Sequence, residues 1–174
     1  IDYVDGLEAL NSSEIRMIGN PVERFEEDPV RMIRAIRFKV KLDATIDPEI
    51  SKSISNQAHL LANIPPARLY EECIKLFHNE KACEVFEHLI KFGLLKYLFQ
   101  QVQETSFIKK TLVNTSRRIK NGKPVTPSFL FAVFLWEAQN KRFNTLYKKK
   151  KSRTLIMTQA SEDVIIKQTK QVLM

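Results

Sequence analysis

The segment Glu27–Phe38 (EDPVRMIRAIRF) constrains the fold most, because it combines the pattern of an amphipathic helix with a clear helix start. Pro29 suits the first turn, where its missing N–H is not needed and its φ is already helical. Asp28 can accept hydrogen bonds from the free N–H groups of that turn and complement the helix dipole. Two faces then separate by spacing: Ile33, Ile36 and Val40 on one, and Arg31, Arg34 and Phe38 on another. The sequence predicts a helix from Pro29 to about Leu42.

The rest of the chain repeats this helical pattern, with proline or glycine at the breaks. Helices are expected to begin near Pro48 and Pro66, and to span Lys81–Lys91, Phe107–Lys120 and Pro127–Asn140. Residues 1–20 are expected to be loop-like, with Glu14–Ile18 as the best strand candidate. With 174 residues, the chain is long enough for a sizeable core, in one domain or in two small domains packed together. The predicted fold class is all-α.

Asp28 and Arg31 place a hydrogen-bond acceptor beside a forked donor, because residues three apart on a helix are neighbours. Adenine and cytosine offer an amino donor next to a ring-nitrogen acceptor, whereas guanine and uracil offer the reverse order. The pair would therefore accept A or C and oppose G or U, at about 1–3 kcal/mol for each buried polar group left unpaired. The alternative is an ordinary helix cap with a solvated ion pair.

Several motifs, in the same order, resemble those of the class II tRNA nucleotidyltransferases and bacterial poly(A) polymerases. They are DYVDGL at Asp2–Leu7, IRMIGNP at Ile15–Pro21, RFEED at Arg24–Asp28 and RMIRAIRF at Arg31–Phe38. Two further segments resemble the poly(A) polymerase branch more than the CCA-adding branch: Ile64–Glu72 (IPPARLYEE) and Val125–Trp136 (VTPSFLFAVFLW). The resemblance covers roughly residues 1–140.

The resemblance implies an all-α, multi-helix neck and body after a short remnant of the catalytic head. The head would end within residues 1–20, the neck with its nucleotide-recognition and RNA-binding helices would span 21–100, and the body with a basic tail would span 101–174. In that family the Asp and first Arg of the E-D-x-x-R motif recognise the incoming base, which points to Asp28 and Arg31. Arg16 lies in the R-x-I-G motif, at the join between head and neck.

Arg34 and Arg37 complete the candidate nucleotide-binding set, with less certain roles. Arg37 lies nearer the apolar face of its helix and is expected to pair with a buried carboxylate. Arg68 and Glu72 are four residues apart and are expected to form a structural ion pair.

The net charge of +8 favours a polyanionic partner, and the resemblance makes an RNA 3′ end the expected one. The candidate RNA-binding residues are basic and clustered: Lys148, Lys149, Lys150 and Lys151, with Arg117 and Arg118. The alternative for the lysine run is a solvated stretch without a partner. A further aromatic run has a spacing that favours core packing over base stacking: Phe129, Phe131, Phe134 and Trp136.

No catalytic or metal-binding residue is assigned to this chain. The family transfers nucleotides with paired carboxylates that hold two Mg²⁺ ions, whereas this sequence has no Asp-x-Asp and only four glycines. ATP is therefore expected as the substrate of a parent enzyme, with Mg²⁺ bound by residues outside this chain, and the chain alone is expected to be inactive. Ile1 opens within a motif and is not a methionine, which favours a cut chain.

The two cysteines, Cys73 and Cys83, suit reduced thiols in a cytoplasmic protein. No apolar run reaches membrane-spanning length and no signal-peptide pattern opens the chain, so no membrane partner is expected.

The sequence therefore predicts the nucleotide-selecting and RNA-binding part of a poly(A) polymerase, which adds AMP from ATP to RNA 3′ ends. CCA addition to tRNA remains an alternative, because it uses the same A-or-C template. A non-catalytic RNA-binding or protein-interaction module built from the same helices is the other alternative.

Overall fold

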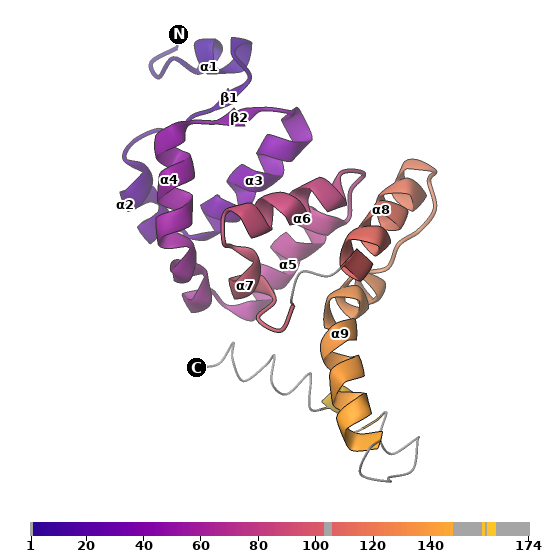
Figure 1. The fold of residues 1–174 in the computed structure, drawn as a ribbon. Helices are drawn as coiled ribbons and strands as arrows, with labels where there is room; N and C mark the ends of the chain where they lie inside the picture. Colours follow the sequence, from indigo (N-terminus) through magenta and orange to yellow (C-terminus); the bar gives the residue numbers. More distant parts are fainter. Residues whose placement is uncertain (1, 103–105, 148–157, 159, 163–174) are drawn as a thin grey trace.

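The computed structural model describes residues 2–102, 106–147, 158 and 160–162. The elements, in chain order, are α1 (Gly6–Asn11), β1 (Glu14–Ile15), α2 (Pro21–Glu27), α3 (Val30–Leu42), β2 (Thr45–Ile46), α4 (Pro48–Gln57), the 3-10 helix η1 (Ala58–Asn63), α5 (Pro66–Phe77), α6 (Ala82–Lys91), α7 (Leu95–Leu98), α8 (Ser106–Lys120) and α9 (Pro127–Tyr147). The predicted all-α class is confirmed. In Figure 1, α1 and the strands lie at the N-terminal end, and α9 extends away from the other helices.

The geometry at Gly19 explains the turn that leads into α2. Gly19 has φ +88°, and a Cβ at this position would lie 3.2 Å from Nε of Arg24, so that both the backbone and the space favour glycine. Asn20 then accepts a hydrogen bond from the N–H of Val22 at 2.9 Å and caps the helix. Pro21 occupies the first turn, where it needs no donor.

Asp28 and Pro29 separate α2 from α3. Oδ1 of Asp28 accepts a hydrogen bond from the N–H of Val30 at 3.1 Å, as predicted for a capping aspartate. The predicted apolar face of α3 is confirmed, because its three residues are at most 1% exposed: Ile33, Ile36 and Val40. Burial of each such side chain contributes about 1.5–3 kcal/mol.

The second Asp-Pro start is also confirmed. Asp47 accepts a hydrogen bond from the N–H of Glu49 at 2.8 Å, and Pro48 opens α4. The predicted apolar stripe is buried along α4 and η1: Ile50, Ile54, Ala58 and Leu61. The following helices pack around α6, which contacts α3, α5 and α8 and so lies at the centre of the molecule.

An aromatic cluster joins α9 to the rest of the core. Phe134 is 1% exposed, and its ring centroid lies 4.2 Å from that of Phe99 and 4.6 Å from that of Phe77. Phe131 stacks on Tyr70 of α5 with centroids 5.0 Å apart. The core role predicted for the aromatic run is therefore confirmed for these two residues, whereas Phe129 and Trp136 are exposed.

Four features differ from the sequence prediction. α1 and α7 form where loops were expected, and α9 continues past Asn140 to Tyr147. The predicted strand is confined to Glu14–Ile15, which pairs in parallel with Thr45–Ile46. The two paired strands come from segments far apart in the chain, so local spacing does not reveal their pairing. α1 buries none of its residues, so its sequence shows no periodic apolar face. No helix in the described part of the chain is long and apolar enough to cross a membrane.

Candidate nucleotide-binding site

Asp28 is held in place from two sides at the start of α3. Oδ1 accepts the capping hydrogen bond from Val30, and Oδ2 accepts one from Nη2 of Arg68 at 2.8 Å. Each carboxylate oxygen can accept a second hydrogen bond. Because the side chain is still 17% exposed, Asp28 can accept a hydrogen bond from a ligand without losing either partner.

Arg31 is anchored through one end of its guanidinium. Nη1 donates to the carbonyl of Arg24 at 3.2 Å and to Oε2 of Glu27 at 3.1 Å. Within the described residues Nη2 and Nε of Arg31 have no partner, and the side chain is 38% exposed. Asp28 and Arg31 are therefore held by different partners and not by each other, which leaves an acceptor and a donor available at one helix start.

Glu27 is the residue that fixes Arg31, a role that was not predicted although the two residues are four apart on the chain. Its carboxylate also accepts hydrogen bonds from Nη1 of Arg24 at 2.9 and 3.1 Å, and these lower the pKa of Glu27, with a smaller contribution from Arg31. Nε of Arg24 donates in turn to the carbonyl of Ile18 at 3.1 Å. The turn at Ile18 and the start of α3 are thereby joined by one chain of charged groups.

Arg34 pairs with a buried carboxylate. Its Nη2 and Nε donate to Oε1 of Glu72 at 3.2 and 3.4 Å, and Nζ of Lys75 donates to the same oxygen at 3.1 Å. The Glu72 side chain is 3% exposed. Burial alone would raise the pKa of Glu72, but the hydrogen bonds from Lys75 and Arg34 outweigh it and lower that pKa.

The predicted pairing of Arg37 was wrong. Among the described residues Arg37 forms no ion pair; its guanidinium lies over the ring of Phe38, 4.8 Å from the centroid. The buried carboxylate pairs with Arg34 because it comes from α5, which packs against α3 on the side of Arg34. Helical spacing along α3 could not identify that neighbour.

The predicted pair between Arg68 and Glu72 was also wrong. Arg68 donates to Asp28, and Glu72 turns inward to Arg34 and Lys75. The two residues are close on α5, but contacts between helices outweigh a surface pair of this kind, which contributes only about 0.3–0.5 kcal/mol. Arg68 is a further candidate site residue, and its partner lies 40 positions away in the sequence.

Arg16 lies apart from this network of partners. Its guanidinium donates to Glu14 at 2.7 Å and to Glu8 at 3.3 Å, and these hydrogen bonds raise its pKa. It lines a hollow of about 490 Å³ with residues of α1 and of the turn at Gly19. Arg16 lies between α1 and α2, and nothing brings it into contact with Asp28 or Arg31.

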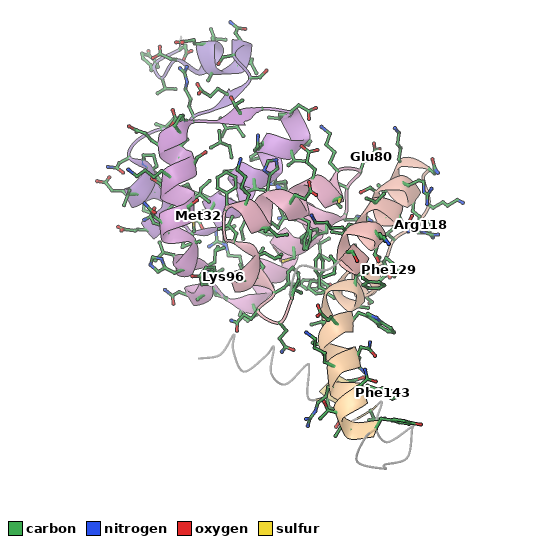
Figure 2. The ribbon with its side chains drawn as sticks, viewed as in Figure 1. Met32, Glu80, Lys96, Arg118, Phe129 and Phe143 are labelled. Carbon is green, nitrogen blue, oxygen red and sulfur yellow. The ribbon has the colours of Figure 1, made fainter. Side chains whose placement is uncertain are left out.

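The candidate RNA-binding residues are described in part. Arg117 and Arg118 are exposed near the end of α8, and Figure 2 labels Arg118 there. Arg117 donates to Oδ1 of Asn114 at 2.6 Å, and Arg118 donates to the carbonyl of Pro124 at 3.2 Å. Lys148, Lys149, Lys150 and Lys151 lie outside the described residues.

Possible metal ligands do not gather into a cluster of three or more among the described residues. Nowhere among them do three His, Cys, Asp or Glu side chains come close enough to hold a metal ion. Asp2, in the first motif, accepts hydrogen bonds from the N–H groups of Leu7 and Val4 at 2.8 and 3.1 Å, and the pKa of Asp2 is lowered by them. It thus acts as a local cap.

Comparisons with known proteins show which family the chain belongs to. Residues 43–105 match the family described as "Probable RNA and SrmB- binding site of polymerase A". The Poly(A) polymerase I of Salmonella typhi is 41% identical over 145 residues, which are 78% of this chain and 31% of that protein. The chain belongs to the family of poly(A) polymerases and CCA-adding nucleotidyltransferases. It spans about a third of the length of the poly(A) polymerases that it matches.

Other members of this family are also similar. The CCA-adding enzyme of Limosilactobacillus reuteri is 42% identical over 97 residues, 56% of this chain and 24% of that protein. The solved structure of the Thermotoga maritima CCA-adding enzyme complexed with tRNA has a TM-score of 0.66 at 25% identity, over 78% of this chain and 34% of that one. A tRNA-processing enzyme in an apo form has a TM-score of 0.67 at 20% identity, over 92% of this chain and 48% of that one, and so supports the fold alone.

Proposed function

We propose that this chain is the nucleotide-selecting and RNA-binding part of a poly(A) polymerase that adds AMP from ATP to RNA 3′ ends. The observation that carries the proposal is the arrangement at the start of α3: a fixed carboxylate, Asp28, and a guanidinium, Arg31, with a free edge. The 41% identity to poly(A) polymerase I over 78% of the chain supports this branch of the family.

Base selection would follow from hydrogen-bond polarity. Asp28 accepts a hydrogen from the amino group of adenine, and Arg31 donates to the neighbouring ring nitrogen. Arg68 and Glu27 keep these two side chains in place, since they bond to Oδ2 of Asp28 and Nη1 of Arg31. Guanine and uracil would oppose both groups with the wrong polarity and leave them unpaired.

The rest of the reaction would use groups beyond this chain. Mg²⁺ held by residues outside this chain would supply Lewis-acid activation for the attacking 3′-hydroxyl and charge neutralisation for the leaving pyrophosphate. Arg117, Arg118 and the Lys148–Lys151 run would hold RNA phosphates. Two free thiols, Cys73 and Cys83, suit a cytoplasmic place of action.

CCA addition to tRNA is the second candidate, and the 42% identity to a CCA-adding enzyme over 97 residues favours it. Cytosine has the same order of donor and acceptor as adenine, so the template itself accepts both bases. Incorporation by the intact enzyme distinguishes the two. A poly(A) polymerase adds AMP repeatedly to unrelated RNA, whereas a CCA-adding enzyme adds CMP and AMP to tRNA and then stops.

The Arg31→Ala variant of the intact enzyme tests base selection. It removes the donor to the adenine ring nitrogen, so the preference for ATP over GTP in kcat/KM should fall by about 5- to 150-fold. Lys52→Ala removes an exposed lysine of α4 and serves as the control, with the preference unchanged. An equal loss of kcat/KM for all four nucleotides would instead assign Arg31 to structure or to phosphate binding.

A further inference from the structure

A second hollow lies toward the other end of α3 from Asp28. Its volume is about 490 Å³, and it is lined by α3 and by the region where α5 turns into α6: Arg37, Val40, Lys41, Lys75, Asn79, Glu80, Lys81 and Val85. Figure 2 labels Glu80 at the turn between α5 and α6. Lys41 lies ten residues beyond Arg31, or about 15 Å along the helix axis, so the hollow is separate from the base-reading pair.

The hollow is cationic. Among the described residues eight line the hollow; four of them are Arg or Lys, and Glu80 is the only acidic one of the eight. Lys81 donates to Asp43 and to the carbonyl of Val40, so its charge is largely compensated. Lys75 shares the single carboxylate of Glu72 with Arg34, which leaves this trio with an excess positive charge.

Arg37 and Lys41 provide the uncompensated charge. Neither forms an ion pair with any described residue. Nε of Arg37 is buried and has no hydrogen-bond partner among the described residues. Because Nε is shielded from solvent, a ligand in the hollow would bind the rest of the guanidinium, whose charge is delocalised over all three nitrogens. A guanidinium binds tetrahedral oxyanions through two parallel N–H···O hydrogen bonds, and the two Nη atoms form one of its forked edges.

We infer that this hollow binds a phosphate group, with Arg37 as the forked donor and with Lys41 and Lys75 as further cations. A phosphate has enough oxygens to accept hydrogen bonds from donors on two helices at once. Val40 and Val85 form the apolar part of the wall of the hollow. The inference rests on the proposed function only for the source of the phosphate, which is then the backbone of bound RNA.

Titration of the chain with inorganic phosphate tests the site directly. The Nε–H signal of Arg37 in ¹H–¹⁵N spectra should shift on binding, and Arg37→Lys identifies that signal because it keeps the charge but removes the group. Lys41 is exposed, so Lys41→Gln should fold normally and weaken phosphate binding by about threefold to tenfold. Lys52→Gln removes an exposed lysine of α4 outside the hollow and should leave the affinity unchanged.

A short oligoadenylate distinguishes the sources of phosphate. If RNA supplies the group, the oligoadenylate shifts the same Arg37 signal and Lys41→Gln weakens its binding; if only free phosphate does so, the site binds a small anion. An Arg37 signal that neither ligand shifts would overturn the inference, as would equal weakening by Lys41→Gln and Lys52→Gln. Base selection is measured separately with Arg31→Ala, so a failure here leaves the proposed function untouched, and the reverse also holds.

Discussion

Removal of both cations from the buried carboxylate of Glu72 should destabilise the chain in a pH-dependent way. In the double variant Arg34→Ala/Lys75→Ala, Glu72 keeps its burial but loses its partners, so its pKa in the folded state should rise above the usual value. Neutralising a carboxyl with an ordinary pKa of 4.5 costs about 1.4 kcal/mol per pH unit, or about 3.4 kcal/mol at pH 7 and about 0.7 kcal/mol at pH 5. The figure for pH 7 is therefore the largest destabilisation that the loss of both cations can cause through Glu72 at that pH.

The sign follows from proton binding. In the wild-type chain the pKa of Glu72 is lowered, so its contribution to stability is present above about pH 4.5 and is lost as the pH falls through the folded-state pKa. In the double variant the folded-state pKa is raised, so the destabilisation should grow as the pH rises from about 4.5 toward 7. Arg34→Ala alone should cost less, because Lys75 still donates to Oε1.

Urea unfolding of each variant at pH 5 and pH 7 measures the free energies. Adding Glu72→Gln to the double variant should restore most of the loss at pH 7, because the amide carries no charge to desolvate. Lys52→Ala/Lys110→Ala removes two exposed lysines and should change the stability little at either pH. A loss that is equal at both pH values, or that Glu72→Gln does not rescue, would refute the argument.

Two further predictions concern the tail and the thiols. Changing Lys148–Lys151 to Gln in the intact enzyme should weaken RNA binding regardless of the RNA sequence, with ATP affinity nearly unchanged. The slope of log affinity against log salt concentration should flatten by about 0.7 for each single-strand phosphate that is no longer neutralised. If neither the slope nor the affinity changes, the lysine run is only a solvated stretch. Burial raises the pKa of the Cys73 thiol to about 12. A thiol reagent near neutral pH should therefore label Cys83 in the folded chain and Cys73 only after urea unfolding. Rapid labelling of Cys73 in the folded chain would contradict its burial.

Local patterns predicted most of the helices. Asp28-Pro29 and Asp47-Pro48 start helices because the capping bonds join groups two or three residues apart, and these are fixed by the chain itself. Apolar spacing also identified the buried face of α3, because a helix repeats its faces every 3.6 residues. The same reasoning missed α1 and α7, which are short, and the parallel pairing of β1 with β2, whose strands lie 31 positions apart.

At the candidate site, sequence identified the residues but not their partners. Asp28 and Arg31 stand out because their types and spacing are local properties of one helix. Their anchors, Arg68 and Glu27, were missed or assigned to other roles. Nothing in the spacing of α5 indicates that Arg68 reaches the start of α3, because that contact depends on how the two helices pack.

What the sequence determined by itself is therefore most of the helices, the apolar face of α3 and the apolar stripe along α4 and η1, and the chemistry gathered in the E-D-x-x-R motif. The tertiary structure decided which charges meet. Because α5 packs against α3, Glu72 pairs with Arg34 and Arg68 pairs with Asp28. Arg37 keeps a buried donor without a partner among the described residues, beside a cationic hollow. A helix fixes neighbours within a few residues through its backbone geometry, whereas partners 38 or 40 positions apart are fixed only when apolar faces pack and carry their polar edges together.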